Sequence, residues 1–372
     1  MGKTLYLGEY CHDKSRRYSL PTVTLMEYVS DVISDVADDF SIISYALSNF
    51  KGRGRIETAT TEKGKRVIYL PIKTQGGGKI KSFLTRLQNK EALLSGLLEN
   101  VQNGDTLVVY HSLYLMDTIK RLRKKRSFRL ILQVCEIYND VTENKEGRKE
   151  EVSYILGADG YIFSSNTLNE MFNPENKPYA VIAGTYKREE EYEKPFDDGK
   201  IHLVYAGTFN PIKGGVFKAI DLALELDENY HLHILGNAEE GLFKAVIKRM
   251  MQAGAKTGCE ITYDGCLQGE EYSKFLQKCH IGLSTQNENL PFSKTSFPSK
   301  ILVYLANGLK VVSAPIEPVQ ATLSGGVYYY GDASFKEALS RAIADTADTR
   351  KIVNDLDMAA RESICRLFAK NK

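Results

Sequence analysis

Two loops in the second half of the chain combine lysine, glycine and hydroxyl side chains where an apolar run passes into a helical pattern. TFNPIKGG follows HLVYAG and contains Gly207, Thr208 and Lys213, and STQNENLPFSKTSFPSK brings Ser299 and Lys300 to the start of ILVYLAN. Glycines let a ligand approach the backbone closely, and ammonium groups at a helix start attract phosphate. We therefore expect an anion here, with a diphosphate the best match. Each loop alone also fits an ordinary turn or capped helix with solvated lysines.

Two further strand ends offer small or polar groups that could border the same ligand. HLHIL runs into Gly236 and Asn237, and EITYD runs into Gly265, Cys266 and Leu267. The first pair could meet a polar group, and the second run could lie along a flat ring. A glycine at a strand end is more often simple turn chemistry, so these positions are less specific than the lysines.

Strand-length apolar runs alternate with amphipathic helical patterns, and this alternation would position the loops. Strands are expected at 4–8, 40–47, 105–112, 129–137, 159–165, 202–207, 231–236, 260–265 and 280–285, and helices at 24–38, 217–226, around 242–254, at 270–279 and from about 335. The segment 297–315 reads as a helix that closes at Gly308 and leads into a strand. The pattern predicts an α/β fold of two Rossmann-like, doubly wound domains facing a cleft.

Chain length and one charged segment predict the domain boundaries. At 372 residues the chain is long for one hydrophobic core, and TYKREEEYEKPFDDGK has Pro195 and no apolar period. We predict an N-terminal domain at 1–186, a linker at 187–200, a C-terminal domain at 201–345 and a helical tail at 346–372 that could pack back on the first domain.

Composition and the chain start restrict the class of protein. A net charge of +2 gives no general attraction to nucleic acid, so no nucleic-acid partner is expected. The six cysteines lack CxxC spacing, which favours reduced thiols and disfavours a zinc site. MGKTLYLGEYCHDKSRR carries charges where a signal peptide needs an apolar stretch. We expect a cytoplasmic protein that at most rests on the inner face of a membrane.

The order of motifs in the second half resembles one enzyme family. YAGTFNPIKGG, HILGN, ITYDGCLQGEEYSKFLQKCHIGLST and FPSKILVYLANGLKVV follow one another as in the donor-binding domain of GT-B glycosyltransferases, most closely those of family 4. The family run P-x-K-x-x-E-Y-L-A-x-G-x-P-V-V is matched at Pro298, Lys300, Tyr304, Leu305, Ala306, Gly308, Val311 and Val312. The resemblance covers roughly residues 200–330, and VIAGTYK at 181–187 resembles the end of the family's first domain.

The resemblance implies a nucleotide-sugar site in the C-terminal domain, with UDP as the expected nucleotide. Thr208, Lys213 and Lys300 would contact the diphosphate, Ser299 would assist, and residues 265–267 would border the base. Breaking a sugar–phosphate bond builds negative charge on the leaving diphosphate, which two lysines and a helix start could stabilise. No metal and no cofactor are therefore expected.

Three positions depart from the family pattern. The glutamate that usually holds the ribose falls on Val303, the proline after the glycine falls on Lys310, and a second family glutamate falls on Thr295. Glu288 in the same loop could supply a carboxylate from another place, although a solvated loop glutamate is the simpler interpretation.

The N-terminal domain would then bind the acceptor and supply a proton acceptor. Its expected strand ends carry Gly8, Glu9, His12, His111 and Glu136, and His111 and Glu9 are the best catalytic candidates. For each of them a local cap or hydrogen bond is the alternative.

Two basic segments could contact an anionic membrane. KIKSFLTRLQNK at 79–90 interleaves basic residues with an apolar stripe at helical spacing, and KRLRKKRSFR at 120–129 has seven basic residues and no acidic one. The first could instead be a helix packed on the sheet, and the second a solvated helix end that leads into a strand.

The sequence thus predicts a metal-independent glycosyltransferase of polysaccharide biosynthesis, which moves a sugar from a nucleotide donor to a glycan or lipid-linked acceptor. The family resemblance favours retention of anomeric configuration. Two alternatives stay open: a catalytically silent accessory subunit of a glycosyltransferase complex, suggested by Val303, and a sugar-nucleotide epimerase on the same architecture.

Overall fold

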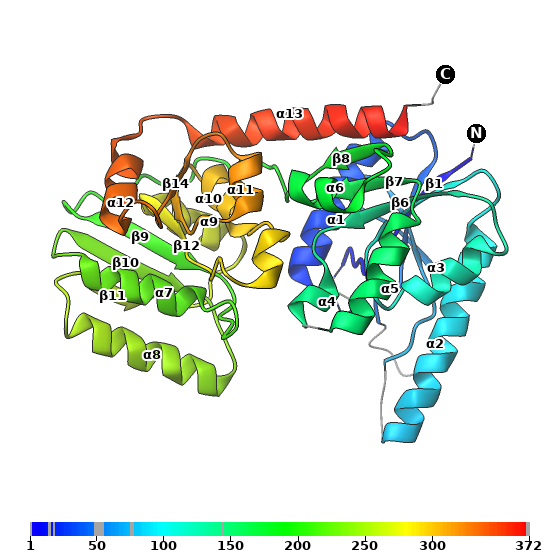
Figure 1. Ribbon diagram of the computed structural model, residues 1–372, viewed down its shortest axis with the longest axis horizontal. Helices are drawn as coiled ribbons and strands as arrows, with labels where there is room; N and C mark the ends of the chain where they lie inside the picture. The colour runs from blue at the N-terminus through cyan, green and yellow to red at the C-terminus, as the bar shows by residue number, and fades with distance from the viewer. Residues whose placement is uncertain are drawn as a thin grey trace. The chain divides into compact units, whose positions relative to one another are not determined.

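The computed structural model describes residues 2–13, 16–17, 19–47, 56–74, 78–142 and 144–369, and its chain forms two compact units (Figure 1). Unit 1 consists of Met1–Thr185 and Ala360–Lys372, and unit 2 of Tyr186–Ala359. The segment 187–200 belongs to unit 2, where Gln277 holds it: the side-chain Oε1 accepts from the backbone NH of Tyr192, and Nε2 donates to the carbonyl of Glu190.

Unit 1 contains a sheet in the order β3-β4-β2-β1-β5-β6-β7-β8 within its described residues. The strands are β1 (Thr4–Gly8), β2 (Phe40–Ser44), β3 (Glu57–Thr60), β4 (Arg66–Tyr69), β5 (Thr106–Tyr110), β6 (Arg129–Val134), β7 (Gly160–Phe163) and β8 (Tyr179–Val181). The pairs are parallel except for β3 with β4, which is antiparallel.

Helices cover this sheet and leave its central strands buried. They are α1 (Leu20–Ser34), α2 (Lys79–Asn100), α3 (Met116–Arg123), α4 (Tyr138–Val141), α5 (Lys145–Leu156) and α6 (Asn166–Phe172). In β1, Leu5, Tyr6 and Leu7 are all buried although neighbouring side chains point to opposite faces, because both faces are covered.

Unit 2 has a parallel sheet in the order β11-β10-β9-β12-β13-β14. The strands are β9 (Ile201–Ala206), β10 (Tyr230–Leu235), β11 (Glu260–Tyr263), β12 (Ile281–Ser284), β13 (Lys310–Ser313) and β14 (Val327–Tyr329). Counted from β9, this is the order 3-2-1-4-5-6 of dinucleotide-binding folds, in which the chain direction across the sheet reverses between the first and fourth strands.

The helices of unit 2 follow its strands in turn. They are α7 (Gly215–Leu222), α8 (Glu240–Gly254), α9 (Gly269–Lys278), α10 (Lys300–Ala306), α11 (Glu317–Thr322) and α12 (Phe335–Ala344), with short 3-10 helices η1 (Ala223–Glu225) and η2 (Pro291–Lys294). The tail contains α13 (Thr349–Phe368), which begins in unit 2 and has its residues from Ala360 onward in unit 1. There the Arg129 guanidinium donates to the Leu367 carbonyl at 2.8 Å.

The predicted α/β alternation is confirmed, with differences at the edges of the sheets. The segment 297–315 forms α10, turns at Gly308 with φ +88°, and continues as β13. The helix predicted at 24–38 instead spans Leu20–Ser34, because Pro21 fits a first helical turn and extends the helix toward the N-terminus. The edge strands β3 and β14, and the short strand β4 next to β3, were not predicted. Among the described residues, no helix is both long and apolar enough to cross a membrane.

Candidate functional site

The candidate donor site lies where the strand order of unit 2 reverses, between the carboxyl ends of β9 and β12. Ligands of open parallel sheets bind at such a point because the loops on either side diverge there. Only two residue pairs join β9 to β12, Ile281 with Leu203 and Gly282 with Val204, so the strands separate before their ends.

Tyr304 of α10 fills the gap between the two strands. Its hydroxyl accepts from the backbone NH of Ala206 at 2.8 Å and donates to the carbonyl of Leu283 at 3.5 Å. The ring is fully buried, and it lies so close to Gly282 that a Cβ there would come within 2.3 Å of it. The family-like tyrosine therefore fixes α10, and with it Lys300, against the ends of the strands.

Three glycines end neighbouring strands at this edge. Gly207, Gly236 and Gly265 follow β9, β10 and β11 with φ of +143°, +141° and +92°. The NH of Gly236 donates to the carbonyl of Gly265 at 2.9 Å, and a Cβ on Gly236 would come within 1.9 Å of the Gly207 carbonyl oxygen. A side chain at position 236 would push the two backbone turns apart, so glycine is required there. The three glycines leave this edge of the sheet without side chains.

Lys300 reaches across this edge to Gly207. Its ammonium lies 3.7 Å from the centre of the Tyr205 ring, and a Cβ on Gly207 would be 3.4 Å from the same nitrogen. Burial, with a smaller contribution from the positive charge of Lys213, lowers the pKa of Lys300 to about 7. An anion beside these two lysines would relieve both penalties, since it would neutralise the charge that burial and repulsion disfavour.

Lys213 comes from the loop between β9 and α7, which hydrogen bonds hold in place. The Asn210 side-chain oxygen accepts from the backbone NH of Lys213 at 2.9 Å, and the NH of Asn287 donates to the Lys213 carbonyl at 3.0 Å. The second bond joins the two lysine-bearing loops. The Lys213 ammonium lies 5.2 Å from the centre of the Phe292 ring.

The other predicted donor residues lie at the same strand ends with less specific contacts. Thr208, Asn237 and Ser299 are exposed, and Gly265 and Leu267 are partly buried. Ser299 makes no side-chain cap bond at the start of α10. The structure thus brings the two lysines and the glycine edge together, and the ligand roles of the exposed residues stay predictions.

Buried polar atoms without a partner among the described residues mark groups that the sequence did not single out. Four of them lie at or just after the carboxyl ends of β12 and β14: Ser284 Oγ, Gln286 Nε2, Tyr329 OH and Tyr330 OH. Ser284 is in register with Ser313, which is in register with Tyr329, so these three side chains share one sheet face at the carboxyl end. Buried groups of this kind normally have a partner, and a polar ligand could provide one.

The structure also explains part of the departure from the family pattern. Thr295 is buried, and its hydroxyl donates to the Phe292 carbonyl at 3.4 Å, so this position faces the interior. Glu288 is partly buried, and its charge contributes, after burial, to raising the pKa of Tyr330. Glu288 is therefore the loop carboxylate that lies close to the unpartnered tyrosine.

In unit 1 the corresponding reversal lies between β1 and β5, and His111 follows β5 there. His111 is 1% exposed, and its Nε2 donates to Glu151 at 2.8 Å, whereas its Nδ1 has no partner among the described residues. Glu151 also accepts from the backbone NH groups of Tyr138 and Asn139 and from the Asn139 amide. Burial by itself would raise the pKa of Glu151, but the hydrogen bonds from His111 and Asn139 lower it by a larger amount. The pKa of Glu151 therefore lies below its usual value.

This arrangement joins β5 to α4 and α5 within unit 1. It is the local hydrogen bond that stood as the alternative to catalysis, and the catalytic role of His111 stays a prediction.

Glu9 follows β1 at the same edge of the sheet and is only partly buried. Burial raises the pKa of Glu9, which makes its carboxylate a better proton acceptor than an exposed glutamate. Its charge also contributes to raising the pKa of Tyr45, after burial as the main cause. Of the two catalytic candidates, Glu9 is the one that a substrate could touch; its role too stays a prediction.

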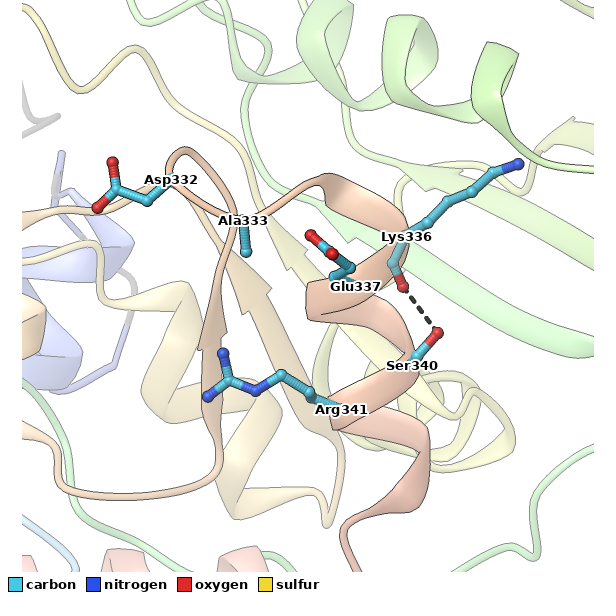
Figure 2. A pocket seen from close by; sticks show the side chains of 6 residues that line it. All are labelled: Asp332, Ala333, Lys336, Glu337, Ser340 and Arg341. Carbon is cyan, nitrogen blue, oxygen red and sulfur yellow. Dashed lines mark hydrogen bonds between the residues drawn. The ribbon is translucent and has the colours of Figure 1, made fainter.

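A shallow hollow beside α12 is a different kind of feature. Figure 2 shows its lining residues, with the Asp332 and Lys336 side chains pointing away from each other. Glu337 accepts from the backbone NH of Ser334 and the Ser334 hydroxyl accepts from the NH of Glu337, so they form a capping box. These groups stabilise a helix start and leave no buried polar atom to bind a ligand.

Solved structures share this architecture. One is "Trehalose-6-phosphate from E. coli bound with UDP-2-fluoro glucose", with a TM-score of 0.66, 10% identity and coverage of 98% of this chain and 95% of that one. The chain has the GT-B fold. A sucrose-phosphate synthase from Thermosynechococcus elongatus gives a TM-score of 0.64 at 12% identity, covering 99% and 95% of the two chains.

An alpha,alpha-trehalose-phosphate synthase (UDP-forming) from Burkholderia xenovorans in complex with glucose-6-phosphate gives 0.66 at 10% identity, covering 98% and 97%. No protein-family model matches the sequence, and no curated protein matches it. At these identities the likeness establishes the fold.

Proposed function

We propose that the chain is a glycosyltransferase that takes its sugar from a UDP-sugar bound to unit 2. The observation that carries the proposal is the pair of lysines at the strand-order reversal, where burial and then the charge of Lys213 lower the pKa of Lys300, which lies beside Gly207. Their charges would stabilise the leaving diphosphate without a metal or cofactor. The structural likeness to UDP-forming synthases supports UDP as the nucleotide. The resemblance to family 4, and with it retention of anomeric configuration, stays part of the proposal.

Ribose binding is assigned to Glu288 in this proposal. Val303 offers no acceptor and Thr295 faces the interior, whereas Glu288 lies close to Tyr330 in the loop after β12. A carboxylate there would accept from the ribose hydroxyls. Gln286 Nε2 and the Tyr330 hydroxyl, which have no partner in the described part of the chain, would bind further polar groups of the donor.

Unit 1 would bind the acceptor, with Glu9 taking the proton of the attacking hydroxyl. We propose a glycan or lipid-linked acceptor because of the exposed apolar stripe on α2: Ile80 is 80% exposed, Phe83 62%, Leu84 52% and Leu87 46%. Spacings of three and four residues place them on one helix face, with Lys81 and Arg86 exposed beside them. Such a face suits an anionic membrane surface, and we therefore propose that the protein works in the cytoplasm on the inner face of the membrane.

The second basic segment contributes less to that contact than its composition indicates. Arg121 pairs with Glu91 and Arg123 pairs with Asp159, so these two charges are compensated on the surface. A sugar phosphate is the other acceptor to test, since structural neighbours are named as phosphate-sugar synthases and one holds glucose-6-phosphate.

The test is protection by UDP against thermal unfolding, followed by turnover. UDP should raise the midpoint temperature of unfolding of the wild type, and should raise that of Lys300→Ala and Lys213→Ala by less. No stabilisation of the wild type, or equal stabilisation of both variants, would refute the donor site.

Turnover then separates the alternatives. UDP-sugars are supplied with lipid-linked, glycan and sugar-phosphate acceptors in parallel. Binding without turnover, together with stable co-purification of a second transferase, would favour the accessory subunit that Val303 suggested, and conversion of the donor sugar without acceptor would reveal an epimerase.

A further inference from the structure

Four of the six histidines of the chain gather toward the amino ends of the strands in unit 2, at the edge opposite the lysines. His202 is the second residue of β9, His231 and His233 lie in β10, and His280 precedes β12. His231 is in register with His202, and His231 and His233 are two residues apart, so these three side chains share one face of the sheet. The strand pairing therefore assembles the group.

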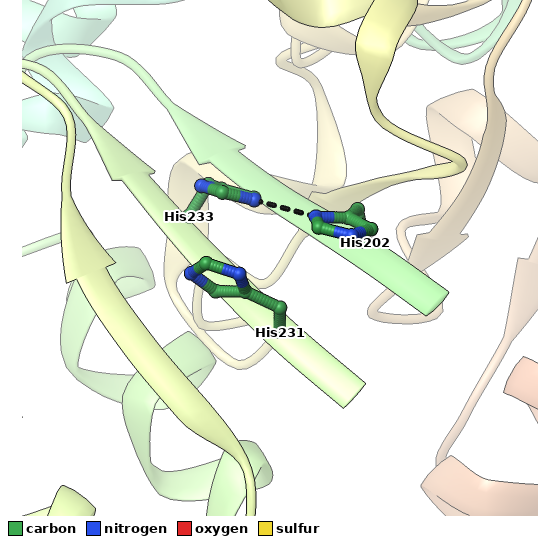
Figure 3. A group of neighbouring side chains, drawn as sticks. All are labelled: His202, His231 and His233. Atoms are coloured by element: carbon green, nitrogen blue, oxygen red, sulfur yellow. Dashed lines mark hydrogen bonds between the residues drawn. The ribbon is translucent and has the colours of Figure 1, made fainter. Parts of the chain in front are cut away.

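The three imidazoles are close enough to share one ion. A ring nitrogen from each of His202, His231 and His233 lies within 4.8 Å of the other two. Nδ1 of His202 is 2.8 Å from Nε2 of His233, and the rings of His231 and His233 stack with centroids 3.9 Å apart (Figure 3). Figure 3 shows His231 below His233, with the facing nitrogens of His202 and His233 directed at each other.

Carboxylates face the outer nitrogens of two of these rings. Nε2 of His202 lies 2.9 Å from an oxygen of Asp198, and Nδ1 of His233 lies 3.1 Å from an oxygen of Asp264. A carboxylate behind an imidazole is typical of metal-binding histidines, because it fixes the ring and strengthens the nitrogen that binds the ion.

The third ring has a similar, looser environment. Nδ1 of His231 is 3.6 Å from Glu260, and its Nε2 is 3.0 Å from the Thr262 hydroxyl. His231 is also the most exposed of the three, whereas His202 and His233 are buried. An ion would therefore reach the site past His231.

The hydrogen-bond pattern leaves a place for a cation. If the outer nitrogens of His202 and His233 donate to their carboxylates, the facing nitrogen of each neutral ring has a free lone pair, and these two nitrogens lie 2.8 Å apart where one ion could bind both. Phe196 stacks on His202 at 4.3 Å and Phe275 meets His233 edge-on at 5.2 Å, so aromatic rings border these two histidines. A metal ion would satisfy the same nitrogens.

We propose that His202, His231 and His233 bind one divalent transition-metal ion, with Zn²⁺ as the ion that suits three imidazoles and a water ligand. Zn–N bonds of about 2.0–2.1 Å place tetrahedral ligands roughly 3.4 Å apart, so the pair now at 2.8 Å separates slightly and His231 moves inward. The ion joins β9 to β10 and, through Asp198, to the segment before β9. This site is independent of the proposed donor site.

The first experiment needs no substitution. The full chain is stripped with a chelator and titrated with Co²⁺, and the Zn²⁺-loaded chain is examined by X-ray absorption. We expect one ion per chain, Co²⁺ absorption bands with the intensity of a four-coordinate ion, and a nitrogen shell at about 2.0–2.1 Å with imidazole scattering. Failure to take up an ion at micromolar concentration, or a sulfur shell near 2.3 Å, would overturn the proposal.

Variants then assign the ligands. His202→Gln and His233→Gln should abolish the Co²⁺ bands, and His12→Gln, in the other unit, should keep them. Asp264→Asn removes only the carboxylate behind His233 and should weaken binding roughly 10- to 100-fold, which keeps the test valid if a histidine variant does not fold. Wild-type affinity in both histidine variants, or in Asp264→Asn, contradicts the site; UDP protection in Asp264→Asn is a separate readout of the donor site.

Discussion

The pKa of Lys300 makes donor binding sensitive to pH in a direction that the structure fixes. In the free protein burial and the charge of Lys213 lower that pKa to about 7, and a bound diphosphate would raise it again. The affinity for the donor is then highest at pH values below about 7 and falls as pH rises, because Lys300 must take up a proton to pair with the anion.

The size of the effect follows from the fraction of charged lysine. With a pKa of about 7, Lys300 is roughly three-quarters charged at pH 6.5 and about 3% charged at pH 8.5, so Kd should rise on the order of 25-fold if the pKa in the complex exceeds 8.5. UDP-glucose is the ligand to use, since its diphosphate is a diester and its charge is constant over this range. Titration calorimetry at the two pH values measures the ratio.

Lys300→Met supplies the internal comparison. It should weaken UDP-glucose binding at pH 6.5 by about 10- to 150-fold, because a hydrogen bond to a charged group contributes roughly 1.5–3 kcal/mol. The Kd of this variant should be nearly independent of pH. Lys248→Met, an exposed lysine on α8, should behave as the wild type. A wild-type Kd that is constant from pH 6.5 to 8.5, or a Lys300→Met variant that keeps the pH dependence, would refute the reasoning.

Three further changes test the parts that support the site. Lys213→Met removes the repulsion on Lys300, so the midpoint of the pH dependence should move upward in the same calorimetric assay; an unchanged midpoint would remove Lys213 from the site. Tyr304→Phe leaves the buried NH of Ala206 without its partner and should lower the free energy of unfolding by about 1–3 kcal/mol in urea, and a loss near zero would contradict the bridging role. Gly236→Ala should destabilise by roughly 1–3 kcal/mol or more through its φ of +141° and the close Gly207 carbonyl, whereas Gly254→Ala, in open space on α8, should be neutral or slightly stabilising; equal effects would argue against a strained edge.

The parts of the fold that could be predicted from sequence depend on local pattern. The apolar runs of β9 and β10 and the helical pattern of α10 could be predicted because periodicity involves neighbouring residues. The weak edge strands β3 and β14 lack such a pattern, since an edge position buries only part of each strand.

The site was predictable only in part for the same reason. Lys213 and Lys300 stood out by residue type, but the approach of Lys300 to Gly207, and the charge effect of Lys213 on Lys300, depend on the pairing of β9 with β12. Glu151 meets His111 across 40 residues of sequence, and no local signal marks such a partner.

The histidine group shows the limit most clearly. The absence of CxxC spacing among the cysteines disfavoured a zinc site, but cysteine spacing carries no information on histidines. His231 and His233 form an H-x-H pair on a strand, which is a visible signal for two side chains on one face, whereas His202 joins them only through the register of β9 and β10.

Transfer of a labelled sugar is the most direct test of the proposed activity. The purified chain is incubated with isotope-labelled UDP-sugars and the acceptor panel, and mass spectrometry follows both UDP release and label on the acceptor. We predict that one acceptor class becomes labelled and that UDP is released in equimolar amount. In Lys300→Met, both the labelling and the UDP release should be lost. Binding of UDP-sugar with no labelled acceptor, or transfer that survives in Lys300→Met, would contradict the assignment.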